Sequence, residues 1–393
     1  MKNMLKSVLL LIGIAFLLPT ENMTAQTLQF EDVNTVITAV PFLRIAPDAR
    51  TGALGDVGIA LSPDAATMWA NPSKIAFAED EMSISVTYTP WLRQLQLKDV
   101  YLAFLSGYYK IDKDQAIGLS MRYFDLGNIQ FTNENGDPLQ TASPREYEIT
   151  GTYARKLGEK ISAAAGLKFI YSQLAVGTFA GNTYKPGTAV AGDISFTYQD
   201  DISISEYDSR LRIGGAITNV GSRIAYTDEA ENRDYIPTNL GLGAALEMDI
   251  DEFNTIAIAV DVNKLLVPTP TEDNLDGDAI LDYKQLGTAE AIFGSFGDAP
   301  GGGSEELSEL MFSAGLEYWY NKQFAVRAGY YYEAPTKGNR QYFTAGIGLK
   351  YNVFGIDISY LVPTTNINNP LNNTLRFTLV FDLEAFSADG PVD

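Results

Sequence analysis

The sequence of 393 residues contains no histidine and no cysteine. Histidine is the commonest general base and a frequent zinc ligand, so its absence excludes a Ser–His–Asp triad and most zinc sites. Without cysteine the chain has no disulfide, no thiolate site and no lipid anchor of the bacterial lipoprotein kind. The 49 carboxylates show no pattern that singles out a catalytic pair. We therefore expect a protein that is not an enzyme, with no catalytic residue, no metal site and no cofactor.

Basic residues and long apolar runs are also scarce. The 28 lysines and arginines stand against 49 acidic residues, and the resulting formal charge of -21 disfavours nucleic acid as a partner. The longest apolar run, eleven residues from Val8, is too short to cross a bilayer as a helix. It follows Lys2 and Lys6 and precedes a small-residue stretch before Gln26. This layout predicts a secretory signal peptide over residues 1–25.

Many segments have a period of two in their apolar residues. In "LRFTLVFDLEAF", residues 375–386, apolar side chains occupy every second position and mostly polar ones lie between them. Such alternation predicts half-buried strands with one apolar and one polar face. Fourteen segments follow this pattern: 81–90, 99–111, 115–126, 145–156, 160–174, 187–199, 209–220, 238–249, 253–263, 310–320, 323–333, 341–352, 354–361 and 372–384.

The connections between these segments alternate in length. The links after the second, fourth, eighth, tenth and twelfth segments are short, and the link after the sixth segment is of moderate length. The links after the third, fifth, seventh and ninth segments are long. Short turns at one end and long loops at the other are typical of outer-membrane β-barrels, with the short turns in the periplasm. The 22 tyrosines and 20 phenylalanines, many near strand ends, are typical of aromatic girdles. A soluble sandwich or propeller explains the alternation but not the loop lengths.

We therefore predict an all-β transmembrane protein, a fourteen-stranded antiparallel outer-membrane β-barrel in contact with outer-membrane lipid. The barrel is expected over residues 81–386, its largest extracellular loop over 264–309 and a C-terminal tail over 387–393. A barrel with this many strands leaves a lumen that holds either water or a plug.

The segment before the first strand suits a plug. Residues 42–58, "FLRIAPDARTGALGDVG", and 64–74, "DAATMWANPSK", are rich in glycine, other small residues and charge, which fits neither a strand nor a stable helix. Glycine permits close backbone approach, and a charge inside a narrow lumen needs a partner. We predict an N-terminal hatch over residues 26–80 that fills the lumen or holds a ligand, with a turn at Asn71 before proline. The expected plug residues are Arg44, Asp48, Arg50, Asp56, Asp64, Trp69, Asn71 and Pro72.

The two plug stretches, extended to "FLRIAPDARTGALGDVGIA" and "DAATMWANPSKIAF", closely resemble the N-terminal signature of the PorV family, outer-membrane components of the type IX secretion system. That family belongs to the wider group of FadL-like barrels, the long-chain fatty-acid transporters, which share the strand number and the N-terminal hatch. The resemblance implies a location in the cell outer membrane and a role without chemistry. It also implies three kinds of partner: a very large translocon barrel protein, secreted proteins with C-terminal signal domains, and a sortase-like attachment complex.

The predicted extracellular loops supply candidate partner-binding residues. Residues 288–297, "TAEAIFGSFG", place large apolar side chains where water is expected; such residues often mark an interaction surface, or they pack onto the barrel rim as a cover. Loops 132–144 and 178–187 are turn-rich. The candidate partner-binding residues are Ile292, Phe293, Phe296, Asn182, Tyr184 and Asn135.

Two other functions stay open at this point. The wider barrel group implies a channel for uptake of hydrophobic compounds, which needs an apolar pocket past the hatch, and the charged hatch counts against it. An outer-membrane enzyme that acts on lipid through serine or paired carboxylates is disfavoured by the lack of histidine. The stretch "EDNLDGDAILD", residues 272–282, fits a calcium loop only in part, because position twelve of an EF-hand alignment holds Tyr283 instead of glutamate.

Overall fold

The computed structural model describes residues 34–93, 97–132, 135–136, 138–179, 182–227, 233–271, 282–364 and 373–383. The chain divides into Met1–Val33, which falls outside this description, and one compact unit from Asn34 onwards. The predicted signal peptide (1–25), the partial calcium motif up to residue 281 and the predicted tail (387–393) also lie outside the described residues. In the described part of the chain, no helix is long and apolar enough to cross a membrane.

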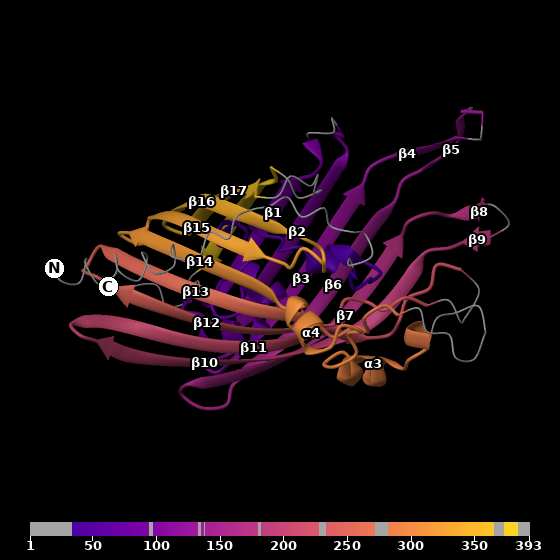
Figure 1. The fold of residues 1–393 in the computed structure, drawn as a ribbon. Helices are drawn as coiled ribbons and strands as arrows, with labels where there is room; N and C mark the ends of the chain where they lie inside the picture. The colour runs from indigo at the N-terminus through magenta and orange to yellow at the C-terminus, as the bar shows by residue number, and fades with distance from the viewer. Residues whose placement is uncertain are drawn as a thin grey trace, which may run out of the picture. The chain divides into compact units, whose positions relative to one another are not determined.

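Within the described residues, fourteen antiparallel strands form a closed barrel in which β1 pairs with β18 (Figure 1). Their bounds lie close to the fourteen predicted segments, so the predicted barrel is confirmed. The barrel strands are β1 (Met82–Pro90), β2 (Val100–Lys110), β3 (Gln115–Leu126), β6 (Arg145–Lys156), β7 (Ile161–Gln173), β10 (Gly187–Ile204), β11 (Tyr207–Gly221), β12 (Asn239–Asp249), β13 (Asn254–Leu265), β14 (Met311–Tyr320), β15 (Phe324–Tyr332), β16 (Gln341–Tyr351), β17 (Phe354–Pro363) and β18 (Leu375–Leu383).

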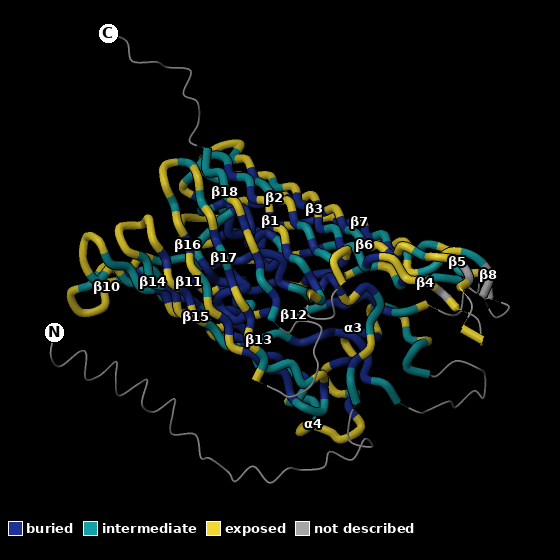
Figure 2. The backbone as a smooth tube through the Cα atoms, turned by 90° about the horizontal axis from the view of Figure 1, so that it is seen from above, coloured by how far each residue is buried: buried dark blue, intermediate teal, exposed yellow. Residues whose placement is uncertain are grey.

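Side chains alternate between the two faces of the wall, so that buried and exposed positions follow one another along the strands (Figure 2). Leu167 and Ile194 are 74% and 70% exposed on the outside, whereas Ser85, Ser106 and Thr378 face inward and are buried. Inward hydroxyls bond across neighbouring strands, as Ser85 and Ser106 do at 2.8 Å. An apolar outer band around a polar interior is what a barrel needs in lipid, and it places this wall in an outer membrane.

The two ends of the barrel differ in their connections. At the end that we call periplasmic, turns of a few residues join the strands, for example 352–353 between β16 and β17. At the opposite end, called the outer end, the connections are long. Short turns face the periplasm in outer-membrane barrels, which sets the orientation. The described elements of the outer connections are the hairpin of β4 (Ile129–Thr132) and β5 (Pro138–Ala142), the hairpin of β8 (Gly177–Phe179) and β9 (Asn182–Tyr184), the 3-10 helix η6 (Asp282–Lys284), α3 (Thr288–Gly294) and α4 (Gly303–Ser308).

The predicted moderate link between the sixth and seventh segments is wrong, because a tight turn joins them. β10 runs to Ile204 and β11 starts at Tyr207, so two residues connect the strands. Ser205 adopts a left-handed backbone with φ of 56°, which suits the first position of a two-residue hairpin turn. The two carboxylates Asp200 and Asp201 interrupt the apolar alternation, so the predicted strand ends before Ile202 and Ile204, which share a face with Tyr207.

Residues 34–80 fill the lumen, as expected for the predicted plug; they form the indigo segment inside the barrel in Figure 1. Phe42, Ala49 and Ile75 of this segment are completely buried. Helix α2 packs against β15 to β18, and η4 packs against β6, β7 and β10. The plug therefore contacts opposite parts of the wall. Its short elements are η2 (Pro41–Arg44), α2 (Ala49–Ala53), η3 (Ala66–Trp69) and η4 (Pro72–Phe77).

The plug spans the lumen from one end to the other. At the outer end, the Asn34 N–H donates to the carbonyl oxygen of Thr336, in the connection between β15 and β16, at 3.1 Å. At the periplasmic end, the carbonyl oxygen of Glu81 accepts from the Lys110 N–H at 2.8 Å. The described chain thus enters the fold among the outer connections and reaches β1 at the periplasmic end.

Local sequence explains how the plug elements begin. The carboxylate of Asp48 caps α2 by accepting from the Thr51 N–H at 2.8 Å. Asn71 is extended, with φ of -154°, as expected before Pro72, and its side chain accepts from the Ser73 N–H at 3.1 Å. The predicted turn at Asn71 is therefore the start of η4, because proline is well suited to the first helical position.

Candidate functional site

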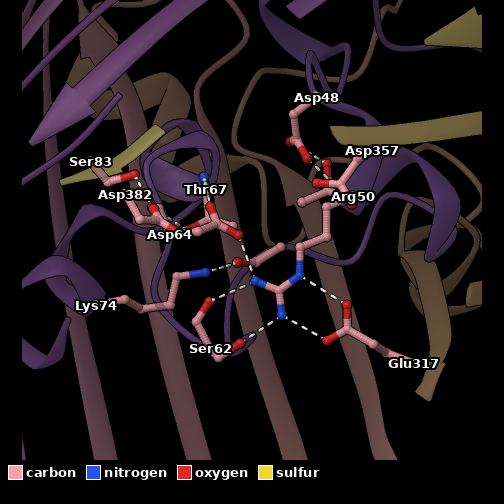
Figure 3. A network of polar contacts seen from close by, with 12 residues as sticks. Asp48, Arg50, Ser62, Asp64, Thr67, Lys74, Ser83, Glu317, Asp357 and Asp382 are labelled. Atoms are coloured by element: carbon pink, nitrogen blue, oxygen red, sulfur yellow. Dashed lines mark hydrogen bonds and ion pairs between the residues drawn. The ribbon is translucent and has the colours of Figure 1, made fainter. Parts of the chain in front are cut away.

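Arg50 of the plug lies at the centre of a buried ionic network (Figure 3). Its Nε and Nη2 donate to the two carboxylate oxygens of Glu317 at 3.0 and 2.8 Å. Its Nη1 donates to Asp64 at 2.5 Å and to the carbonyl oxygen of Ser62 at 3.2 Å, and Nη2 also donates to Ser62 Oγ at 2.6 Å. All five guanidinium donors therefore have a partner. Burial alone lowers the pKa of Arg50, but Glu317 and Asp64 raise it well above its usual value, so the group stays charged.

Glu317 joins the plug to the wall. It lies on β14 opposite Arg327 of β15, whose Nε donates to Glu317 Oε2 at 2.6 Å. Arg327 Nη1 also donates to Asp357 of β17 at 2.5 Å. Sequence reasoning missed these three wall residues, because alternation marks them only as inward and their pairing depends on strand register. Removing one partner from such a buried ion pair destabilises the fold, because it leaves the other charge buried and unpaired.

Three further predicted plug residues bond within the plug or to β10. The Asp48 carboxylate that caps α2 also accepts from Trp69 Nε1 at 3.0 Å, which joins α2 to η3. Asn71 Nδ2 donates to Thr197 Oγ1 of β10 at 3.0 Å, while Pro72 opens η4. These residues position the plug elements against each other and against the wall.

Arg44 and Asp56 contact the outer half of the wall and the connection beyond β15. Arg44 Nη2 donates to Glu333 at 3.0 Å. One oxygen of Asp56 accepts from the Tyr342 hydroxyl at 2.5 Å, and the other lies 3.6 Å from the Arg376 guanidinium. Burial raises the pKa of Asp56, and Arg376 opposes that rise. Four of the five predicted plug charges thus have an oppositely charged partner, and the fifth, Asp48, accepts hydrogen bonds from Thr51 and Trp69.

The glycine-rich turn of the plug is held from both sides at Gly58. Asp261 of β13 accepts from the N–H groups of Gly58 and Ile59 at 2.7 and 3.0 Å, and Lys74 donates to the Gly58 carbonyl oxygen. A side chain at Gly58 would come within 2.8 Å of the Ala70 Cβ. Lys74 is completely buried, and burial lowers its pKa to about 7. Sequence analysis did not single out Lys74 or Asp261.

Two cavities lie on opposite sides of the plug. The outer cavity has a volume of about 90 Å³, and Arg44, Arg122 and Arg340 are among its lining residues. The second cavity, which we call the periplasmic vestibule, has a volume of about 600 Å³ and is lined by Arg50 and Asp64 of the plug together with charged wall residues. Ligand pockets for apolar compounds are mostly apolar, whereas 15 of the 28 residues around the vestibule and six of the 21 around the outer cavity are charged.

The long connection over residues 266–310 is tied to the outer rim by two buried lysines. Lys264 and Lys337 both donate to Glu309, Lys337 at 3.0 Å, and each also donates to a glutamate of α4. Burial alone raises the pKa of Glu309, but its bonds to Lys264, Thr269 and Lys337 lower it below the usual value, so the carboxylate stays charged. These ionic contacts fix α4 against the barrel.

The structure brings together the three apolar candidate residues of this connection. Ile292 and Phe293 lie on α3, and Phe296 follows just after its end. Phe293 and Phe296 are 77% and 53% exposed, whereas Ile292 is half-buried and its neighbour Ala291 is completely buried. The sequence left two alternatives for these residues, an interaction surface or a cover packed onto the rim. Ala291 and part of Ile292 are buried, as in a cover, whereas the two phenylalanines face solvent.

The other candidate residues lie on separate outer hairpins. Asn182 and Tyr184 belong to β9, and Asn135 lies at the tip between β4 and β5. Both hairpins project beyond the barrel and lie apart from α3 in Figures 1 and 2. The six candidates therefore do not form a single site.

Among solved structures, similar ones include the P. putida toluene transporter TodX (11% identity, 86% of this chain and 99% of that chain, TM-score 0.48) and the CymD monoaromatic hydrocarbon channel (12% identity, 86% and 98%, TM-score 0.49). A Pseudomonas aeruginosa FadL homologue is similar at 9% identity, with 89% and 99% covered and a TM-score of 0.43. No curated protein matches the chain in sequence.

The sequence profile of one family, described as type IX secretion system protein PorV, matches residues 28–272, which is more than half of the chain. The match covers the plug, with its Arg50 and Asn71 contacts, and the wall from β1 to β13. This plugged barrel of the outer membrane therefore belongs to the PorV family of type IX secretion system proteins.

Proposed function

We propose that this protein carries secreted proteins, recognised by their C-terminal signal domain, from a very large translocon barrel to a sortase-like attachment complex at the cell surface. Membership of the PorV family supports this role. Carrying a folded partner needs binding surfaces at the outer end and no reacting group. The observation on which the proposal rests is the exposed pair Phe293 and Phe296 on a connection fixed to the outer rim.

Exposed aromatic residues at a fixed position are well suited to binding a protein partner. Aromatic side chains are enriched at the centres of protein interfaces and account for much of the binding free energy there. Leu307, on α4 of the same connection, is 68% exposed and adds further apolar surface. Because Lys264 and Lys337 hold α4 on the rim, and Tyr235 and Thr288 hold the segment that carries α3, less conformational entropy is lost on binding than with a free loop.

The charged residues inside the lumen favour a role in partner binding at the outer end over a role in uptake of hydrophobic compounds. A compound that enters from outside meets the guanidinium groups of Arg44, Arg122 and Arg340 in the outer cavity. Beyond them the plug is held by Arg50 and Asp56 through ion pairs with the wall. Each contact would have to break before an apolar molecule reached the periplasmic vestibule.

Replacing Phe293 and Phe296 together with serine is expected to lower the recovery of co-purifying secreted proteins by about tenfold or more. Loss of an aromatic residue at the centre of an interface costs about 2 kcal/mol, and 1.4 kcal/mol corresponds to a factor of ten. The measurement is quantitative mass spectrometry of proteins that co-purify from native outer membrane in mild detergent.

The matched control is Leu157→Ser in the periplasmic turn after β6, where an exposed apolar side chain is also lost. This control should retain its co-purifying proteins, because the turn lies at the opposite end of the barrel. Normal recovery with the double phenylalanine variant would show that the connection over 266–310 is not the cargo-binding surface.

A further inference from the structure

The hairpin of β10 and β11 extends past its neighbours at the periplasmic end. Pairing between β10 and β7 ends at Tyr198, and pairing between β11 and β12 begins at Ser209. The two strands continue to pair with each other until Ile204 opposite Tyr207. Residues 200–208 therefore form a two-stranded ribbon with no strand beside it, and an exposed hairpin is visible at the label β10 in Figure 2.

The β10 side of this ribbon presents backbone groups to an open edge. The Gln199 N–H donates to the carbonyl oxygen of Lys160 at 2.8 Å, so Gln199 points toward β7. Backbone groups alternate in direction along an antiparallel strand, and Asp201 and Ser203 therefore point the same way, past the end of β7. An open edge of this kind is a template for an added strand from another chain.

The ribbon also forms part of the wall of the periplasmic vestibule. Asp201, Ser203 and Asp208 are among the vestibule's lining residues. Nine carboxylates and six basic groups line this cavity of about 600 Å³, an excess of three negative charges. Glu206 at the turn of the ribbon is exposed and adds another. The edge and the cavity beside it therefore favour a positively charged occupant.

The charge of the chain's own segments excludes them as that occupant. Residues 26–33 and 384–393, which lie outside the described residues, contain no lysine or arginine and carry two and three carboxylate side chains. A second copy of the chain would bring the same acidic ribbon against this one. The observations favour a different protein with a basic segment in an extended conformation.

We propose that the ribbon and the periplasmic vestibule form a docking site for an extended, lysine- or arginine-rich segment of a periplasmic partner. The segment adds as a strand to the β10 edge at Asp201 and Ser203, and its basic side chains face the carboxylates of the vestibule. This site is separate from the outer surface that carries Phe293 and Phe296, and neither proposal depends on the other.

The test is binding of a fluorescent eight-residue peptide of alternating lysine and valine to the purified barrel, measured by anisotropy. Ser203→Pro removes a backbone donor from the open edge without touching the β10–β11 ladder, because Ser203 points away from β11. It should weaken binding by about tenfold or more. A factor of ten corresponds to about 1.4 kcal/mol, which is the free energy expected for the loss of one or two hydrogen bonds. The matched control Ser203→Thr keeps the donor and should bind like the unchanged protein.

A second variant, Glu206→Gln with Asp208→Asn, leaves the edge intact and should weaken binding several-fold at low salt and less at high salt. A peptide of alternating glutamate and valine should not bind. Equal binding of the two peptides, or binding that Ser203→Pro and the charge variant leave unchanged, would overturn the proposal. Circular dichroism of each variant confirms that the barrel is folded before binding is compared.

Discussion

Replacing Gly329 with valine is expected to drive the plug out of its seat while the barrel stays closed. Gly329 is an inward position of β15, and a Cβ there would lie 2.1 Å from Gly55 N and from the carbonyl carbon of Leu54. Gly55 itself has φ of 70°, and a Cβ on Gly55 would lie 2.5 Å from the carbonyl oxygen of Tyr330. Backbone atoms cannot move aside as side chains do, so the expected cost exceeds the range of about 1–3 kcal/mol for ordinary overpacking.

Two measurements report on plug release in the Gly329→Val variant. Trypsin should cleave at Arg50 and Lys74, which are buried in the unchanged protein, and cells should become permeable to large antibiotics. Ala328→Val is the matched control, because this neighbouring side chain faces outward and is exposed. A protected plug in the Gly329→Val variant would mean that the contact between α2 and β15 does not hold the plug in place.

Replacing Glu317 with glutamine is expected to give the largest loss of stability among single changes in the Arg50 network. The amide leaves Arg50 and Arg327, both buried, without the carboxylate that they share. Removing one partner of a buried ion pair typically costs about 3–5 kcal/mol. The midpoint of heat unfolding, followed by the shift of the folded barrel on cold electrophoresis, should fall clearly, and trypsin should reach the plug at a lower temperature.

The control for Glu317→Gln is Lys160→Gln, which removes the exposed pair between Lys160 and Asp200. Exposed ion pairs contribute little, so no measurable change is expected. If both variants unfold at the same temperature as the unchanged protein, the ionic network does not hold the plug to the wall.

Strand positions could be predicted from the sequence because lipid and lumen impose a period of two. The apolar alternation of β18, with Leu375, Phe377 and Leu379 on the outside, is an example in which the pattern alone locates the strand. The same reasoning failed at residues 200–208, because Asp200 and Asp201 break the apolar alternation that Ile202 and Ile204 resume. It also missed the hairpins of β4 with β5 and β8 with β9, whose short strands lie within turn-rich loops.

The plug could be predicted in position but not in its contacts. Composition indicated that Arg50 needs a partner, and Asp64, only fourteen residues away, is one of them. Glu317 is 267 residues away, and nothing local distinguishes it from other inward acidic residues. Partners of that kind follow from strand register around the closed barrel, which a single sequence does not contain. Likewise, α3, which carries Phe293, is held by bonds from Tyr235 to the Leu286 carbonyl oxygen and from Thr288 to the Gly221 carbonyl oxygen, and no local pattern marks these contacts.

The charged residues of the molecule gather in three places. Inside the barrel, Glu317 pairs with both Arg50 of the plug and Arg327 of the wall and so joins the two. At the outer end, glutamates of the 266–310 connection bond to Lys264 and Lys337 and hold α4 on the rim. At the periplasmic end the carboxylates are in excess over basic groups. The 266–310 connection thus exposes Phe293, Phe296 and Leu307 at the outer end, whereas the vestibule at the periplasmic end is acidic.

The most direct measurement is purification of the protein from its native outer membrane in mild detergent, with mass spectrometry of everything that co-purifies. Recovery of a very large barrel protein, together with secreted proteins that share a C-terminal domain, is the predicted result. A protein that emerges alone, with a fatty acid or another small hydrophobic compound bound in its lumen, would contradict the carrier role and indicate an uptake channel.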